Sequence, residues 1–393
     1  MSVPKLRFKE FDGEWAGSKL GRLIGISSAS RVFKEQWQES GVPFYRTSDV
    51  ISIFKNKENE KAYISLELFE ELAKKSGKIQ KGDLLVTGGG TIGIPYLIPN
   101  NEPLYFKDAD LLWLKSSGVI DGSFLYNFFI SPKFREYLKS ISHTGTISHF
   151  TIEQAKETPF KFPSKPEQTK IASFLCAVDE KISQLTQKHE LLSQYKQGMM
   201  QKLFSQQIRF KADDGSEFGE WEEKTLGEVV NFSNGKRIPL SEGDRQQRQG
   251  EYRYYGASGV IDYIDEYIFD GQYILIGEDG ANILTRSSPL AFVVEGQFWV
   301  NNHAHIFQSK HGNNVFLATY LESLNYEKFN SGTAQPKLNM DNLKKVPVIN
   351  PCIEEQTKIA NFLSAIDQKI EVVAQQIEHA KTWKKGLLQQ MFV

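Results

Sequence analysis

The stretch EQTKIASFL at residues 167–175 returns as EQTKIANFL at residues 355–363, and this repeat decides the fold. At one constant offset the match runs without a gap from Pro159 and Pro347 to Phe204 and Phe392, with about half of the positions identical. A long self-match of this kind indicates that one structural plan occurs twice in a chain. The sequence therefore predicts an internal repeat with a pseudo-twofold relation between its halves.

A second match joins the starts of the two halves. LRFK begins at Leu6 and IRFK at Ile208, and EWAGSKLG at residues 14–21 returns as EWEEKTLG at residues 220–227. Repeated ends with unlike middles favour a shared scaffold that carries two different recognition surfaces, whereas a duplicated enzyme would more often repeat its site residues. We predict recognition domain 1 over residues 1–162, a helical spacer over 163–207, recognition domain 2 over 208–350 and a second helical spacer over 351–393.

Both EQTKIA segments predict long helices, because neither contains an internal proline and their apolar residues alternate in steps of four and three. A helix of about 35 residues reaches roughly 50 Å, so it needs a packing partner. We expect the two helices to pair as a coiled coil, with a homo-oligomer through the same seam as the alternative. Lys196 and Lys384 hold equivalent seam positions and are expected to fix the register or to mark fraying. The predicted pairing residues are Ile171, Leu175, Val178, Ile182, Leu185, Leu192, Ile359, Leu363, Ile366, Ile370, Val373 and Ile377.

Composition is that of an ordinary soluble protein. The 393 residues include 47 Lys plus Arg against 48 Asp plus Glu, so the net charge of -1 gives no global basic excess and DNA binding must rest on local surfaces. No apolar run approaches the roughly 20 residues of a membrane span, and the N-terminus is too polar for a signal peptide. Cys176 and Cys352 lack the close Cys or His neighbours of a zinc site. We expect a cytoplasmic protein.

The two middles share an order of strands first and a helix late. Strand-like runs begin at Asp83 and Asp110 in the first half and at Tyr273 and Pro289 in the second, and helical runs follow from Gly122 and from Asn313. The predicted fold class is α+β, with two mixed α/β recognition domains separated by the two paired helices.

Several loops in both middles place basic residues beside aromatic or amide side chains. Lys and Arg neutralise phosphates, Asn and Gln pair with adenine, and carboxylates accept from cytosine N4. The candidate DNA-contacting residues are Arg46, Thr47, Ser48, Thr87, Gly89, Thr91, Thr146, Ser148 and His149 in the first half, and Lys236, Arg237, Tyr255, Ser258, Glu278, Asp279, Asn282, Asn301, Asn302, His303, Gln335, Lys337 and Asn339 in the second.

Two catalytic interpretations of these loops are weaker. TGGGTIG at residues 87–93 lacks the Gly-Lys-Ser/Thr of a P-loop and the glycine spacing of a dinucleotide fold, and is typical of a tight turn. Glu278, Asp279, His303 and His305 are a conceivable metal set, but alternate residues of a strand point to opposite faces. A stand-alone nucleotide- or metal-dependent DNA-modifying enzyme and a non-catalytic coiled-coil adaptor are therefore the alternative functions.

The whole pattern resembles the specificity subunit of type I restriction-modification enzymes. The residues that carry the resemblance cover essentially the full chain: RFKEFDGEWAGSKLG from Arg7, RFKADDGSEFGEWEEKTLG from Arg209, the two EQTKIA helices, GEDGAN at 277–282, WVNNHAH at 299–305 and GTAQPKLN at 332–339. The resemblance implies two target-recognition domains that each read one half of an asymmetric, bipartite DNA sequence, joined by two conserved helices that act as a spacer.

The resemblance also implies partners besides double-stranded DNA. These are two methyltransferase subunits, which use S-adenosylmethionine to methylate adenine, and two restriction subunits with an ATP-driven motor, Mg and a nuclease. The chain itself would bind no cofactor or metal and catalyse nothing. The sequence agrees, because it contains no NPPF-like tetrapeptide and no Walker A motif; NPCI at Asn350 departs from the methyltransferase pattern.

Overall fold

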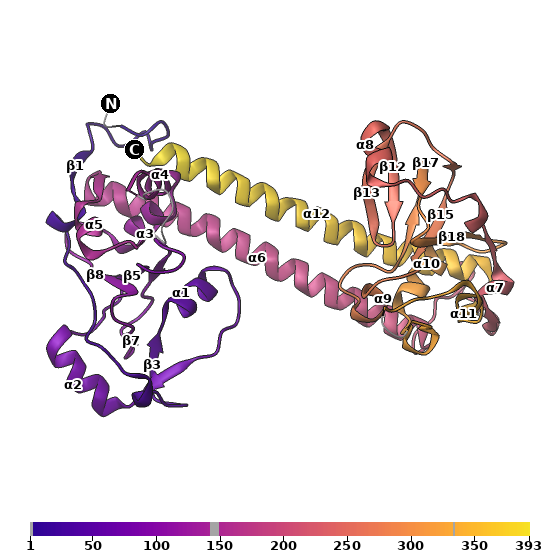
Figure 1. The fold of residues 1–393 in the computed structure, drawn as a ribbon, viewed down its shortest axis with the longest axis horizontal. Coiled ribbons are helices and arrows are strands. Elements are labelled where there is room, and N and C mark those ends of the chain that lie inside the picture. The colour runs from indigo at the N-terminus through magenta and orange to yellow at the C-terminus, as the bar shows by residue number, and fades with distance from the viewer. Residues whose placement is uncertain (1–2, 142–148, 333–334) are drawn as a thin grey trace. The chain divides into compact units, whose positions relative to one another are not determined.

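A computed structural model describes residues 3–141, 149–332 and 335–393. The chain forms two compact units: Met1–Gln187 with Ala374–Val393 is unit 1, and Lys188–Val373 is unit 2. Each unit combines one predicted recognition domain with parts of both long helices (Figure 1). Among the described residues, no helix is both long and apolar enough to cross a membrane.

Unit 1 contains a four-stranded antiparallel sheet in the order β2-β8-β5-β6. Its central strands carry the apolar runs LLVT and LLWL, and all eight residues are buried, so both faces of the sheet are covered. A three-stranded sheet, β4-β3-β7, and the pair β1-β9 complete the strands. The bounds are β1 Ala16–Lys19, β2 Ile26–Ser27, β3 Val42–Tyr45, α1 Thr47–Phe54, β4 Ala62–Ile64, α2 Leu66–Ser76, β5 Leu84–Thr87, β6 Pro95–Leu97, β7 Tyr105–Phe106, β8 Leu111–Leu114, α3 Gly122–Ile130, α4 Pro132–Ile141, α5 Ile152–Glu157 and β9 Pro159–Phe162, with 3-10 helices Leu20–Arg22 and Lys34–Gln36.

Unit 2 repeats this arrangement in its sheet β11-β18-β15-β16 and its pair β10-β19. A second four-stranded sheet, β13-β12-β17-β14, is larger than its counterpart in unit 1 and includes the long hairpin β12–β13 (Figure 1). The bounds are β10 Glu222–Thr225, α7 Leu226–Val229, β11 Val230–Phe232, α8 Glu242–Gln247, β12 Gln249–Gly256, β13 Gly259–Ile264, β14 Phe269–Asp270, β15 Tyr273–Gly277, α9 Asn282–Thr285, β16 Ala291–Val294, β17 Gln297–Val300, β18 Ala304–Ser309, α10 Asn314–Ser323, α11 Met340–Lys344 and β19 Pro347–Asn350, with 3-10 helices Asn234–Lys236 and Glu327–Phe329.

The two long helices are α6, Lys165–Phe204, and α12, Ile353–Met391. In unit 1 the start of α6 packs with the end of α12 in one apolar cluster that holds Leu175, Val178, Leu387 and Met391. In unit 2 the end of α6 packs with the start of α12, through Leu203, Ile359 and Leu363. The predicted mixed α/β fold with two long helices and an internal repeat is confirmed.

The predicted pairing residues differ in how deeply they are buried. Ile182, Leu192 and Ile370 are half-buried, and the other nine are buried. Each seam lysine forms an ion pair with an aspartate of the opposite helix: Lys384 Nζ lies 2.5 Å from Asp179 in unit 1, and Lys196 Nζ lies 2.6 Å from Asp367 in unit 2. The repeat aligns both lysines and both aspartates, so the same cross-helix contact occurs in each unit.

A buried glutamate near the start of each long helix holds the repeated N-terminal motif of its unit. In unit 1, Glu167 accepts hydrogen bonds from Arg7 at 2.7 Å and from the indole of Trp15 at 3.3 Å. In unit 2, Glu355 accepts from Arg209 and from the indole of Trp221, both at 2.7 Å. Charge-assisted hydrogen bonds of this kind fix geometry as well as adding stability. The EQTKIA glutamate therefore fixes the repeated N-terminal motif of each unit to its long helix.

Candidate nucleic-acid interface

Four stretches that lie far apart in the sequence of unit 2 meet at one end of strands β15 and β18. The N–H of Glu278, just after β15, donates to the carbonyl oxygen of His303 at 2.8 Å. The N–H of Leu338 donates to the carbonyl oxygen of Glu278 at 2.8 Å, and Asp279 forms a β-bridge with Lys337. The backbone thus brings the GEDGAN, NNHAH and QPKLN loops together, and Asn234 joins them by accepting from the N–H of Ile306 at 2.9 Å.

Ionic contacts fill the centre of this site. Arg237 Nη1 lies 2.9 Å from the Glu278 carboxylate and also donates to the carbonyl oxygen of Ala304 at 2.6 Å. Lys337 Nζ lies 3.6 Å from Glu278. Burial alone would raise the pKa of Glu278, but the hydrogen bond from Arg237 and the positive charges of Arg237 and Lys337 hold that pKa below its ordinary value. Glu278 is therefore a carboxylate at neutral pH.

His305 lies beneath this network and is 1% exposed. Burial lowers the pKa of its imidazole, against the raising effects of the Leu338 carbonyl and of Glu278. Asn234 Nδ2 lies 2.7 Å from Nδ1, and Nε2 lies 2.7 Å from the Leu338 carbonyl oxygen. These partners suit a neutral ring with its proton on Nε2, so His305 holds the loops together.

The exposed rim of the site carries the groups available to a ligand. His303 is exposed, and its Nδ1 lies 2.9 Å from Asp279. The tip of the β12–β13 hairpin lies against the same loops, because the N–H of Asn301 donates to the carbonyl oxygen of Tyr255 at 3.0 Å. Hydrophobic side chains next to this tip, Val260 and Ile261, are 41% and 52% exposed.

Unit 1 repeats the backbone hydrogen bonds that join these loops in unit 2, and we call this shared set of bonds the backbone frame. The side chains on the frame differ between the units. The N–H of Gly88 donates to the carbonyl oxygen of Asp110 at 2.8 Å, and the N–H of Phe150 donates to that of Gly88 at 2.9 Å. These bonds match those of Glu278 and Leu338, so position 88 corresponds to 278, 110 to 303, and 149 to 337. In addition, Thr151 caps α5 just as Asn339 caps α11.

Three charged residues of unit 1 are absent from the contacts predicted from the sequence: Lys107, Asp110 and Arg31. Asp110 lies beside Gly89 and pairs with Lys107 at 2.6 Å. Arg31 is exposed, and its guanidinium lies 5.4 Å from the ring centroid of Phe33. The sequence did contain a signal for Arg31. The spacing between Trp15 and Trp221 in the repeated N-terminal motifs is the same as the spacing between Arg31 and Arg237. Asp110 has no such signal, because only the strand pairing identifies its counterpart.

The predicted contact residues differ in two respects: whether their polar atoms already have partners within the protein, and how exposed they are. Some have polar atoms engaged within the protein: Arg46 binds Asp49, and Asn282 exchanges hydrogen bonds with the backbone of Ser288. Thr146 and Ser148 lie outside the described residues. Those exposed at the surface are Ser48, Thr91, His149, Lys236, Ser258, Asn302, His303, Gln335 and Lys337, while Arg46, Thr47, Thr87, Gly89, Arg237, Tyr255, Glu278, Asp279, Asn282, Asn301 and Asn339 are buried or half-buried.

The four residues named as the alternative metal set do not gather around one point. His305 points inward and His303 outward, as the alternation along a strand requires. Across residues 3–141, 149–332 and 335–393, no group of three or more His, Cys, Asp or Glu side chains is arranged to hold a metal ion.

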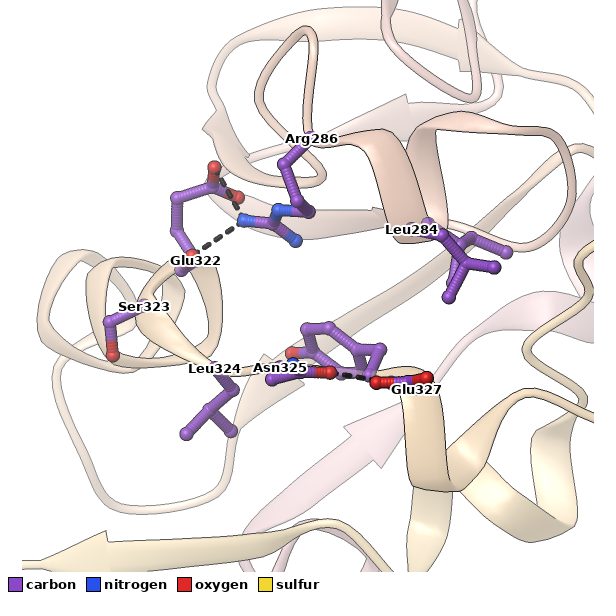
Figure 2. A pocket seen from close by; sticks show the side chains of 9 residues that line it. Leu284, Arg286, Glu322, Ser323, Leu324, Asn325 and Glu327 are labelled. Carbon is purple, nitrogen blue, oxygen red and sulfur yellow. Dashed lines mark hydrogen bonds and ion pairs between the residues drawn. The ribbon is translucent and has the colours of Figure 1, made fainter.

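Another concave surface of unit 2 is the pocket of about 420 Å³ in Figure 2, beside α9 and the end of α10. Arg286 and Glu322, which both line this pocket, lie 2.7 Å apart. The other carboxylate oxygen of Glu322 accepts from the N–H groups of Leu290 and Ala291, each at 2.9 Å. Glu322 therefore fixes α10 against β16, and this cluster supports the scaffold.

Comparison with known proteins identifies the family of the chain. The family model described as the type I restriction modification DNA specificity domain matches residues 12–194 and 219–382. The chain belongs to the type I restriction-modification DNA specificity family. A chain named as a specificity subunit in Haemophilus influenzae is 38% identical, over 39% of this chain and 38% of that protein. The EcoprrI specificity subunit of Escherichia coli is 27% identical, over 90% of this chain and 87% of that protein.

Solved structures support the fold of this specificity chain. The type I restriction-modification S subunit from M. genitalium superposes with a TM-score of 0.63 at 20% identity, over 100% of this chain and 99% of that one. A chain from a structure on complex assembly and conformational transition of the type I R-M system gives 0.56 at 15% identity, over 96% and 97%. The expected family, fold class and DNA-recognition role are confirmed. The expected contact residues stay predictions.

Proposed function

We propose that this specificity chain reads an asymmetric, bipartite DNA target, one half with each unit. The observation that supports this proposal is the shared backbone frame with unlike side chains. Unit 1 presents Gly88, Asp110 and His149 where unit 2 presents Glu278, His303 and Lys337. Because side chains at base edges carry sequence discrimination, unlike sets favour two different half-sites rather than a palindrome.

The long helices are proposed to set the distance between the half-sites. At about 1.5 Å per residue, a 40-residue helix such as α6 reaches roughly 60 Å, enough to separate two readers by one turn of B-DNA, about 34 to 36 Å. The repeated ion pairs and glutamate contacts on these helices support a role as a fixed spacer.

The chain is proposed to act with partners in the cytoplasm and to catalyse nothing itself. Its net charge of -1 favours weak DNA binding by the isolated chain, because neutralisation of phosphates supplies most of the non-specific affinity for DNA. Two methyltransferase subunits would close around the duplex and bring S-adenosylmethionine for adenine methylation. Two restriction subunits would add ATP, Mg and the nuclease.

Mapping of methylated adenines at single-base resolution tests the proposal. Cells with the gene should methylate one split motif, and cells without it should not. Exchanging residues 222–346 for the corresponding part of another family member should change one half of that motif and preserve the other half and the spacing. A motif that changes in both halves or in neither would refute the division of labour between the units.

A further inference from the structure

A cavity of about 360 Å³ opens at the recognition frame of unit 1. Its walls come from the frame itself, Gly88 and His149, from Ala109 and Leu112 beside the start of β8, and from Phe150 and Ile152. Leu112 and Phe150 are almost fully buried, so the floor of the cavity is apolar.

The frame shows what fills the same place in unit 2. Thr87 pairs with Leu111 as Gly277 pairs with Ala304, so Gly88 corresponds to Glu278, Ala109 to Asn302 and Leu112 to His305. Glu278 and His305 belong to the ionic network around Arg237. The cavity therefore exists in unit 1 because small or apolar residues replace that network.

Polar side chains around the cavity already have partners. Ser28 Oγ accepts from the N–H of Ala109 at 3.1 Å and donates to the carbonyl oxygen of Leu111 at 3.3 Å. Thr151 Oγ1 accepts from the N–H of Gln154 at 3.2 Å, and Glu153 pairs with Lys156 at 2.8 Å. A ligand that enters the cavity meets apolar surface, with His149 at its rim.

Glycine at position 88 allows the backbones that line the cavity to approach one another closely. A Cβ there would lie 2.8 Å from the carbonyl oxygen of Phe150, closer than real Cβ contacts allow. Ala109 has a φ of 62°, a conformation that alanine rarely adopts and asparagine tolerates better. The backbone around the cavity is thus held in an unusual shape by its hydrogen bonds.

We propose that this cavity binds the C5-methyl edge of a pyrimidine in the half-site read by unit 1. The inference rests on the proposed function, which brings the frame of each unit against duplex DNA. The thymine methyl is the apolar group that the major groove presents, and 5-methylcytosine offers the same group. An apolar recess among recognition loops matches that group, whereas the ionic network of unit 2 matches polar base edges.

The test removes one methyl group at a time from the DNA. The complex of the chain with its methyltransferase subunits is titrated with duplexes in which each thymine of the unit 1 half-site is replaced singly by deoxyuridine. Binding should weaken about fourfold at one position, the effect of one buried methyl group. A second set of duplexes carries 5-methylcytosine at each cytosine, and tighter binding at one position would identify that base as the source of the methyl group.

The variant Ala109→Asn places the unit 2 residue at the edge of the cavity while suiting the local φ. It should abolish the difference between thymine and deoxyuridine, and Ile152→Thr, which shortens one wall and makes it polar, should reduce it. Asn302→Ala, the matched change in unit 2, should leave the difference intact.

The inference is overturned if no thymine or cytosine of that half-site responds to its C5 substituent, or if Ala109→Asn and Ile152→Thr both keep the full difference. The proposed function survives that outcome as long as the wild-type chain directs methylation to a split motif. Absence of any split motif would instead defeat the proposed function.

Discussion

At the scale of single residues, the buried glutamates at the starts of the long helices give the repeated EQTKIA motif a structural role. Glu167 and Glu355 are 1% and 0% exposed, and each is neutralised by an arginine from the repeated N-terminal motif. A carboxylate in such a place is costly unless it stays paired.

Removal of one arginine should therefore destabilise its unit strongly. Arg209→Met leaves Glu355 with the Trp221 indole and should lower the free energy of unfolding of unit 2 by about 3 kcal/mol. Hydrogen exchange resolves the effect by unit, and Arg7→Met should act equally on unit 1. Lys211→Met breaks the exposed pair with Glu217 and serves as the control, with no measurable change expected. Equal protection in Arg209→Met and Lys211→Met would contradict the role given to Glu355.

His305 should make unit 2 less stable in acid. Because its pKa is lowered in the folded chain, the unfolded chain binds a proton more readily once the pH falls below about 6.5, and stability decreases from there downward. The midpoint of urea unfolding between pH 7.5 and 5.5 measures this slope. His305→Gln should flatten it, whereas His379→Gln, at an exposed position of α12, should not. An unchanged slope in His305→Gln would show that another group titrates.

Residue identities singled out the loops that meet in unit 2, but they predicted neither the meeting of these loops nor the contacts of each side chain within them. The Asn, His and acidic residues of GEDGAN and NNHAH do lie together. Arg237 and Asn301 stay predicted contacts, and in the structure they also form hydrogen bonds that hold these loops together. Such engagement depends on distances between strands, which a linear pattern does not contain.

At the scale of secondary-structure elements, the heptad pattern predicted the long helices well, because their periodicity and missing prolines are local properties. The short strands were harder to predict from the sequence, because β5 and β8 carry unbroken apolar runs without the alternation that marks a half-exposed strand. Which strands pair, and so which loops meet, is a long-range property.

Equivalent leucines of the two helices should be equally important, each to its own unit. Leu175 and Leu363 are 0% and 1% exposed and belong to separate apolar clusters. Each change to alanine should cost about 2 to 5 kcal/mol, with hydrogen-exchange protection lost in unit 1 for Leu175→Ala and in unit 2 for Leu363→Ala. The exposed Leu191 provides the control, because Leu191→Ala should change little. Ile370, a seam residue of the sequence analysis, is half-buried and is therefore a less sensitive position.

At the scale of the whole molecule, charge balance limits what the chain does alone. With 47 basic and 48 acidic side chains it has little electrostatic attraction to phosphate. We expect the isolated chain to bind target and non-target duplexes with dissociation constants no tighter than about 10⁻⁶ M at physiological salt. Fluorescence anisotropy with both duplexes measures this, and addition of the methyltransferase subunits should separate the two curves. Tight, selective binding by the chain alone would show that local surfaces outweigh the net charge.

The backbone frame of the recognition loops has a consequence for how such proteins diversify. Its hydrogen bonds join main-chain groups, so exchanges at positions 110, 149, 303 and 337 leave those bonds in place. Under the proposed function, in which these side chains contact bases, single substitutions at these positions would change the recognised sequence while the fold is kept. Because each half carries its own copy of the frame, the two halves can drift separately, and a few alternatives in each multiply into many combined specificities.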